Sequence, residues 1–110
     1  AYMAPELLSN GLFSRKVDVY AFAVLMYEMF TQSVPFATWD PRDIKDFIQE
    51  GKRLRLPHSG YPKQCGKLIE RCWEEDPDRR PEFKNIVRAL KRIHGTIREV
   101  SFSQEVGSDC

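Results

Sequence analysis

The stretch from Val19 to Phe30 constrains the fold of this chain more than any other, because every residue in it except Glu28 is apolar or aromatic. A helix that is hydrophobic on all sides belongs inside a core, so the sequence predicts a buried central helix over residues 15–30. Ser14 precedes this stretch and can accept a hydrogen bond from a free amide of the first turn. The run is too short for the ~20 residues that cross a bilayer, and no membrane segment is expected.

Shorter amphipathic helices are predicted on both sides of the central one. Proline at a first helical position, apolar side chains at helical spacing and a glycine or an Asp-Pro pair after the last turn indicate them. They cover residues 5–8, 41–50, 63–74 and 81–94. No segment alternates convincingly as a strand would, so the predicted fold class is mainly α, with helices wrapped around one buried helix.

The last part of the chain loses this periodicity. Gly95 is a natural C-terminal stop for the last helix, and Ser, Gln, Glu and Gly dominate after it. Such a composition buries little apolar surface. We therefore expect one domain over residues 1–95 and a disordered tail over residues 96–110.

The charge of the chain is nearly balanced. Seventeen basic and sixteen acidic residues leave a net charge of +1, which gives no broad attraction to nucleic acid or anionic lipid. Lys52, Arg53 and Arg55 form a short basic run, but three cations are better interpreted as a solvated loop. No nucleic-acid partner is expected.

The cysteines and histidines offer neither a disulfide nor a metal site. Cys65 and Cys72 are placed on one predicted helix about 10 Å apart, beyond the reach of a disulfide, and Cys110 leaves the number odd. Neither His58 nor His94 has metal-ligand spacing from a cysteine. A reduced, cytoplasmic location and no bound metal are the expectations.

Several short motifs, taken in order, resemble one family. Together they resemble the C-terminal lobe of a eukaryotic protein kinase, over about residues 1–93. The motifs are Met3-Ala4-Pro5-Glu6, Lys16-Val17-Asp18-Val19-Tyr20-Ala21-Phe22, Cys72-Trp73, Asp76-Pro77 and Arg80-Pro81-Glu82-Phe83. The Cys-Trp and Arg-Pro motifs are similar to those of tyrosine kinases and the tyrosine-kinase-like serine/threonine group. Tyr2, where tyrosine kinases typically carry Trp, favours serine/threonine specificity over tyrosine.

The resemblance implies roles for residues of the first and the last of these motifs. Tyr2 and Met3 would belong to the loop that cradles the substrate peptide. Glu6 would pair with Arg80, and a carboxylate can meet a guanidinium through two parallel hydrogen bonds. Without the resemblance, each would be interpreted as a surface charge, whose pairing contributes ~0–1 kcal/mol.

The resemblance also implies that part of the central helix supports the active site. Asp18 would accept hydrogen bonds from backbone amides of the catalytic loop, while Leu25 and Met29 would support the side chains beneath the adenine. From the residues alone, Asp18 is an acid that the helix dipole stabilises, and Leu25 and Met29 are core residues.

The residues that perform phosphoryl transfer are not in this sequence. A kinase needs a Gly-rich loop, a strand Lys with its helix Glu, a catalytic Asp and an Asp-Phe-Gly for magnesium. The resemblance therefore implies a fragment without catalytic residues, whose parent uses ATP and Mg²⁺ while the fragment alone binds neither. Its expected partners are a protein substrate and the N-terminal part of the kinase domain. A non-catalytic pseudokinase scaffold and a free-standing helical interaction domain remain alternatives.

Overall fold

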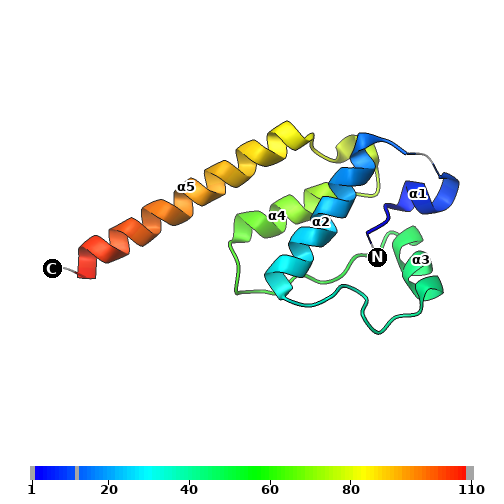
Figure 1. Ribbon diagram of the computed structural model, residues 1–110, viewed down its shortest axis with the longest axis horizontal. Helices are drawn as coiled ribbons and strands as arrows, with labels where there is room; N and C mark the ends of the chain where they lie inside the picture. The colour runs from blue at the N-terminus through cyan, green and yellow to red at the C-terminus, as the bar shows by residue number, and fades with distance from the viewer. Residues whose placement is uncertain (1, 12, 109–110) are drawn as a thin grey trace.

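The computed structural model describes residues 2–11 and 13–108, with side chains as far as residue 97, and contains helices but no strand in that part of the chain (Figure 1). From the N-terminus to the C-terminus, the helices are α1 (Pro5–Asn10), α2 (Arg15–Thr31), α3 (Pro41–Gln49), α4 (Lys63–Cys72), the 3-10 helix η1 (Pro77–Arg79) and α5 (Phe83–Ser108). The predicted mainly α class is confirmed.

The helix α2 forms where the apolar stretch predicts it. The Ser14 hydroxyl accepts from the Lys16 amide at 3.3 Å, which satisfies one free donor of the first turn. The helix ends at Thr31 because Gln32 has a left-handed backbone, with φ of 54°. The predicted range of 15–30 is therefore correct to within one residue.

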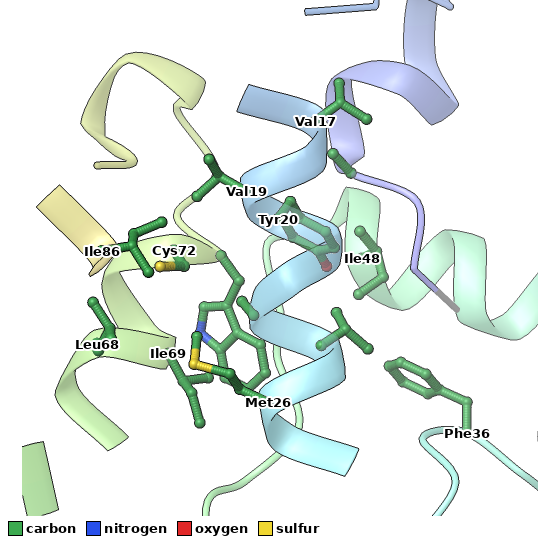
Figure 2. Packing of buried hydrophobic residues seen from close by; sticks show 14 residues of the cluster. Val17, Val19, Tyr20, Met26, Phe36, Ile48, Leu68, Ile69, Cys72 and Ile86 are labelled. Atoms are coloured by element: carbon green, nitrogen blue, oxygen red, sulfur yellow. The ribbon is translucent and has the colours of Figure 1, made fainter. Parts of the chain in front are cut away.

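The hydrophobic core lies on two sides of α2. In Figure 1, α4 runs beside α2, and α1 and α3 lie together on the other side of it. Figure 2 shows Val19 directed toward Cys72 and Ile86, whereas Tyr20 points toward Ile48 of α3. Each apolar side chain that is fully buried in this way stabilises the fold by about 1.5–3 kcal/mol.

A third side of α2 is not covered by the described residues. Leu25 is 42% exposed and Met29 is 62% exposed, so the prediction that both are core residues is wrong for this chain. The sequence shows that these side chains are apolar, but it cannot show that no described element packs against them. The central helix is thus wrapped on two sides rather than all round.

The helices α3 and α4 largely match their predictions. Asp40 Oδ1 accepts from the Arg42 amide at 2.9 Å and so caps α3. The helix α4 ends at Cys72, two residues before the predicted Glu74. Its buried side consists of Cys65, Leu68, Ile69 and Cys72, and Trp73 just after the helix is buried with them.

The last helix differs from its prediction. It continues through Gly95 to Ser108, so the predicted stop at Gly95 is wrong. A glycine inside a helix costs about 1 kcal/mol relative to alanine, which neighbouring turns can offset. Next to it, Thr96 Oγ1 donates to the Arg92 carbonyl at 3.1 Å in the continuing helix. Residues 109–110 lie outside the described residues, and disorder of the tail in solution stays a prediction.

The position of α5 explains the elongated shape of the chain. The helix contacts α4 near its start and then projects away (Figure 1), giving extents of 59 × 31 × 15 Å. Ile86 is buried, but Phe83 and Val87 are exposed although their spacing predicts a core position. The radius of gyration is 16.5 Å, against about 13 Å for a compact chain of this length. Within the described residues, no helix combines the length and hydrophobicity needed to cross a membrane.

Candidate functional site

Glu6 and Arg80 form the predicted pair. Arg80 Nη1 donates to Glu6 Oε2 at 2.7 Å, and Arg80 Nη2 donates to Glu6 Oε1 at 2.8 Å. These are two parallel charge-assisted bonds, the strongest arrangement available to a carboxylate and a guanidinium. Arg80 is only 1% exposed, so this pair is not a surface ion pair. It joins α1 to the loop that precedes α5.

Arg80 uses all five of its N–H donors. Besides the two bonds to Glu6, Nε donates to the Glu74 carbonyl at 2.8 Å, Nη1 to the Lys16 carbonyl at 3.1 Å and Nη2 to the Glu75 carbonyl at 3.3 Å. A buried guanidinium is tolerated when its donors are satisfied in this way. The side chain therefore ties α1, the first turn of α2 and the chain after α4 to one point.

A buried tyrosine of α2 lies against this cluster. The guanidinium carbons of Arg80 and Arg53 lie 5.2 Å and 5.3 Å from the centre of the Tyr20 ring, within cation–π distance. Arg53 is held there because its Nε donates to the Trp73 carbonyl at 2.9 Å. Burial raises the pKa of Tyr20, while the two cations partly lower it. The tyrosine therefore stays neutral between two positive charges.

The protonation of Glu6 depends on two opposing effects. Burial alone raises the pKa of this carboxyl, but the hydrogen bonds from Arg80, a backbone hydrogen bond and the charges of Arg80 and Arg53 lower it. The net pKa lies below the ordinary value of 4.5. Glu6 is thus ionised at neutral pH, as the pair with Arg80 requires.

Lys16 and Glu82 extend the cluster toward α5. Lys16 Nζ donates to the Arg80 carbonyl and lies 3.8 Å from Glu82 Oε1, while Arg15 Nη2 lies 2.9 Å from the same carboxylate oxygen. The start of α2 is therefore held to the residues that immediately precede α5.

Tyr2 is attached to α2 at a different place. Its hydroxyl donates to Glu28 Oε1 at 2.6 Å. This hydrogen bond, with some burial and the negative charge of Glu28, raises the pKa of Tyr2. Glu28, the one polar residue of the apolar stretch, is thus the residue that positions the N-terminal loop against α2.

Met3 lies beside a small apolar cleft between α1 and α3. The cleft has a volume of about 210 Å³. Its walls include Leu8 of α1 and Ile44 and Ile48 of α3, and Lys45 stands beside them. Met3 is exposed at this cleft rather than buried in the core.

Asp18, Leu25 and Met29 share one side of α2, which we call the open face. At 100° per residue, these positions fall within about 40° of one another around the helix. All three are exposed, and within residues 2–11 and 13–97 no hydrogen bond or ion pair reaches the Asp18 carboxylate. The open face thus offers one carboxylate and two apolar side chains that no described residue covers.

The residues singled out from the sequence therefore fall into separate places around α2 rather than into one pocket. Glu6 and Arg80 meet directly, Tyr2 and Met3 lie on the loop before α1, and Asp18 belongs to the open face. The roles of Tyr20 and Arg53 were missed by sequence reasoning, because nothing in the spacing of Arg53 distinguishes it from a loop cation. Glu28 could have been suspected, since it is the only polar residue in an apolar run.

The part of the chain that the structure describes holds no group of three or more His, Cys, Asp or Glu side chains that could bind a metal ion. Its two described cysteines, Cys65 and Cys72, are buried free thiols. Burial raises the pKa of Cys72 to about 11, so this thiol is protonated and unreactive at neutral pH.

Comparison with known proteins agrees with the sequence motifs. Residues 1–90 match the family model described as protein tyrosine and serine/threonine kinase. The serine/threonine-protein kinase VIK of Arabidopsis thaliana is 34% identical over 96 residues, which cover 87% of this chain and 22% of that protein.

Two further relatives differ in the acceptor that their names state. The serine/threonine/tyrosine-protein kinase HT1 of Arabidopsis thaliana is 37% identical over 99 residues, covering 89% of this chain and 25% of that protein. The megakaryocyte-associated tyrosine-protein kinase of Mus musculus is 36% identical over 107 residues, covering 96% of this chain and 20% of that protein. The chain thus spans about a quarter or less of the length of these curated relatives.

Proposed function

Because the chain belongs to the family of protein tyrosine and serine/threonine kinases, we propose that the intact protein transfers the γ-phosphate of ATP to serine or threonine side chains of a protein substrate. In this proposal the 110 residues supply the substrate loop and the mechanical support of the active site. The residues that carry out the transfer are contributed by other parts of the kinase domain, so the chain alone is inactive.

The open face of α2 is the observation that carries the structural part of the proposal. Leu25 is 42% exposed and Met29 is 62% exposed on a helix whose other sides are buried. A free-standing helical interaction domain would bury these side chains within its own core, so their exposure favours a partner segment of the same kinase domain. The Asp18 carboxylate beside them can accept amide hydrogen bonds from a loop laid across this face.

The Tyr2–Met3 loop supports the proposed contact with the substrate. The Tyr2–Glu28 bond fixes the loop on α2, and the Glu6–Arg80 pair fixes the residues that follow it. A loop held at both ends loses little conformational freedom when a peptide binds to it. Positioning of this kind is the main contribution that a protein makes to phosphoryl transfer.

The kinase family implies that the intact protein uses ATP and Mg²⁺. When bound, they supply the phosphoryl group and neutralise its developing charge. In this proposal the chain contributes orientation, while the metal ligands belong to other parts of the kinase domain. Asp18 holds the catalytic loop, and the Glu6–Arg80 pair holds the end of the segment that carries Tyr2 and Met3.

The serine/threonine preference rests on Tyr2, which stands where tyrosine kinases typically carry Trp. A cytoplasmic location is part of the proposal and is supported by the free thiols of Cys65 and Cys72. Both are expectations for the intact protein.

The test is a phosphorylation assay with the intact protein, the 110-residue chain and peptide mixtures in which serine, threonine or tyrosine is the only acceptor. We expect magnesium-dependent transfer by the intact protein to the serine and threonine peptides and none by the chain alone. Transfer to tyrosine only would contradict the proposed acceptor. A folded intact protein without any transfer would favour the pseudokinase scaffold.

A further inference from the structure

A basic cleft adjoins the Tyr20 cluster, since Arg53 belongs to both. It has a volume of about 790 Å³ and runs between the extended segment 53–58 and the helix α4. Pockets of about 300–1,000 Å³ are the usual size for bound ligands, so this cleft can hold several side chains of a partner. The Glu6–Arg80 pair and the open face contribute no lining residue to it.

Positive charge is concentrated around this cleft. Arg53, Arg55, Lys63 and Lys67 line it, the last three exposed, and Glu70 is the one acidic residue among its lining residues. The whole chain carries a net charge of only +1, so the local excess is not a reflection of a basic chain. The basic run predicted as a solvated loop is thus combined, by the fold, with two lysines of α4.

These cations are available to a partner. Within the part of the chain whose side chains are described, neither Arg55, Lys63 nor Lys67 takes part in an ion pair. Like charges gathered with Glu70 as the one acidic lining residue repel one another, and an anionic ligand would relieve that repulsion.

The floor of the cleft is apolar, and packing and a hydrogen bond fix the residues around it. Leu54, Leu56 and Trp73 contribute to its lining. Tyr61 also lines the cleft, and its hydroxyl donates to the Pro57 carbonyl at 2.7 Å. Its ring also lies on Gly66, where an added Cβ would come within 3.0 Å of the Tyr61 ring. The cleft is therefore preformed and does not need a partner to create it.

We propose that this cleft, formed by segment 53–58 and the first half of α4, binds an acidic segment of a partner protein in which carboxylates alternate with apolar side chains. The carboxylates pair with Arg55, Lys63 and Lys67, while the apolar side chains rest on Leu54 and Leu56. A nucleic acid suits the cleft less well, because single strands need exposed aromatic faces for stacking. The ring of Tyr61 already packs on Gly66 and lies 5.7 Å from the ring of Phe30.

The experiment measures fluorescence anisotropy of labelled peptides with the intact protein. The probe is a peptide of about ten residues that alternates Glu with Leu, long enough in extended form to follow the cleft. Two comparison peptides replace Leu by Gly or Glu by Gln. We expect both replacements to weaken binding, and we expect higher salt to weaken the binding of the Glu-Leu peptide.

The decisive variant is the double charge reversal Lys63→Glu with Lys67→Glu. It should weaken binding of the Glu-Leu peptide by about tenfold or more, since two attractive contacts become repulsive. Its matched control is Lys84→Glu with Lys91→Glu, which makes the same charge change at exposed positions of α5 outside the cleft. Thermal unfolding of both variants establishes that they are folded.

Three results would overturn the proposal. Equal loss of binding in the two double variants would mean that only overall charge matters. If the Glu-Gly peptide bound as tightly as the Glu-Leu peptide, the apolar lining of the cleft would contribute nothing to binding. Tighter binding of single-stranded DNA of similar length, lost in the Lys63 and Lys67 variant, would assign the cleft to nucleic acid. None of these results depends on kinase activity, so failure of this proposal is distinguishable from failure of the proposed function.

Discussion

Two sides of the same helix, α2, have similar side chains but different surroundings. Met26 packs against α4 and is 2% exposed, whereas Met29, less than one turn further along the helix, is 62% exposed on the open face. Tyr20 lies between two guanidiniums, while the Asp18 carboxylate has no described partner. The amino-acid types of α2 therefore do not decide which of its sides is buried.

The comparison shows how the two sides differ energetically. On the packed side, a single buried Arg80 satisfies five acceptors from four residues, so removal of one group leaves several others unpaired. On the open face, each side chain is in contact with water, and its replacement changes little within this chain. Variants on the packed side should consequently lower the stability of the chain, whereas variants on the open face should lower the activity of the intact protein.

Replacement of Arg80 by alanine should have the largest effect on stability. Loss of one member of a buried ion pair costs about 3–5 kcal/mol, because Glu6 and the backbone carbonyls keep no charged partner. Urea unfolding of the chain measures this change. The control is Arg79→Ala at the neighbouring exposed position, which should change the unfolding free energy by less than about 0.5 kcal/mol. A similar small change in both variants would contradict the importance of the cluster.

The two methionines test the comparison directly. Met26→Ala should lower the free energy of unfolding by about 2–5 kcal/mol, since it leaves a cavity against α4. Met29→Ala should lower it by less than about 0.5 kcal/mol, because water already contacts that side chain. Thermal or urea unfolding of the chain measures both. If the two variants were equally destabilised, the described difference in burial would be wrong.

Asp18→Asn should separate activity from stability. If Asp18 holds the catalytic loop, turnover of the intact protein should fall about 100-fold, since small displacements at a reacting centre have effects of this size. The free energy of unfolding should change by no more than about 1 kcal/mol, the value of a charge in the first turn of a helix.

The control for this variant is Asp43→Asn, which changes the same group in the first turn of α3. It should leave turnover unaltered. Equal turnover of the Asp18 variant and the wild type, at a temperature where both are folded, would make Asp18 an ordinary acid at the start of a helix.

The smallest expected effect is a pH dependence of the Glu6–Arg80 pair. The pKa of Glu6 is lower in the folded chain than its ordinary value of 4.5. The contribution of Glu6 is therefore complete above pH 4.5 and is lost as the pH falls through the folded-state pKa. We expect the stability difference between wild type and Glu6→Gln to shrink below that pH. A constant difference from pH 7 to pH 3, measured by urea unfolding, would show that Glu6 is not the group that titrates.

Much of this architecture could be predicted from the sequence. The Ser14 cap, the apolar stretch and the prolines at helix starts predicted four helices to within a few residues, because caps and periodicity act locally. The predicted end at Gly95 was wrong, since a glycine only weakens a helix and does not always end it. The apolar residues Phe83 and Val87 are exposed although Ile86 and Ile93 of the same helix are buried, because the described residues do not cover that side of α5.

By itself, the sequence determined that residues 19–30 of α2 are apolar except for Glu28. The pairing of Glu6 with Arg80 was an expectation that came from the resemblance to protein kinases. Only the tertiary structure decided which side of α2 is covered, that Arg53 and Arg80 both reach Tyr20, and that Lys63 and Lys67 join Arg55 around one cleft. The physical reason is that caps and helical periods depend on residues a few positions apart, whereas burial and charge clustering depend on which distant segments pack together.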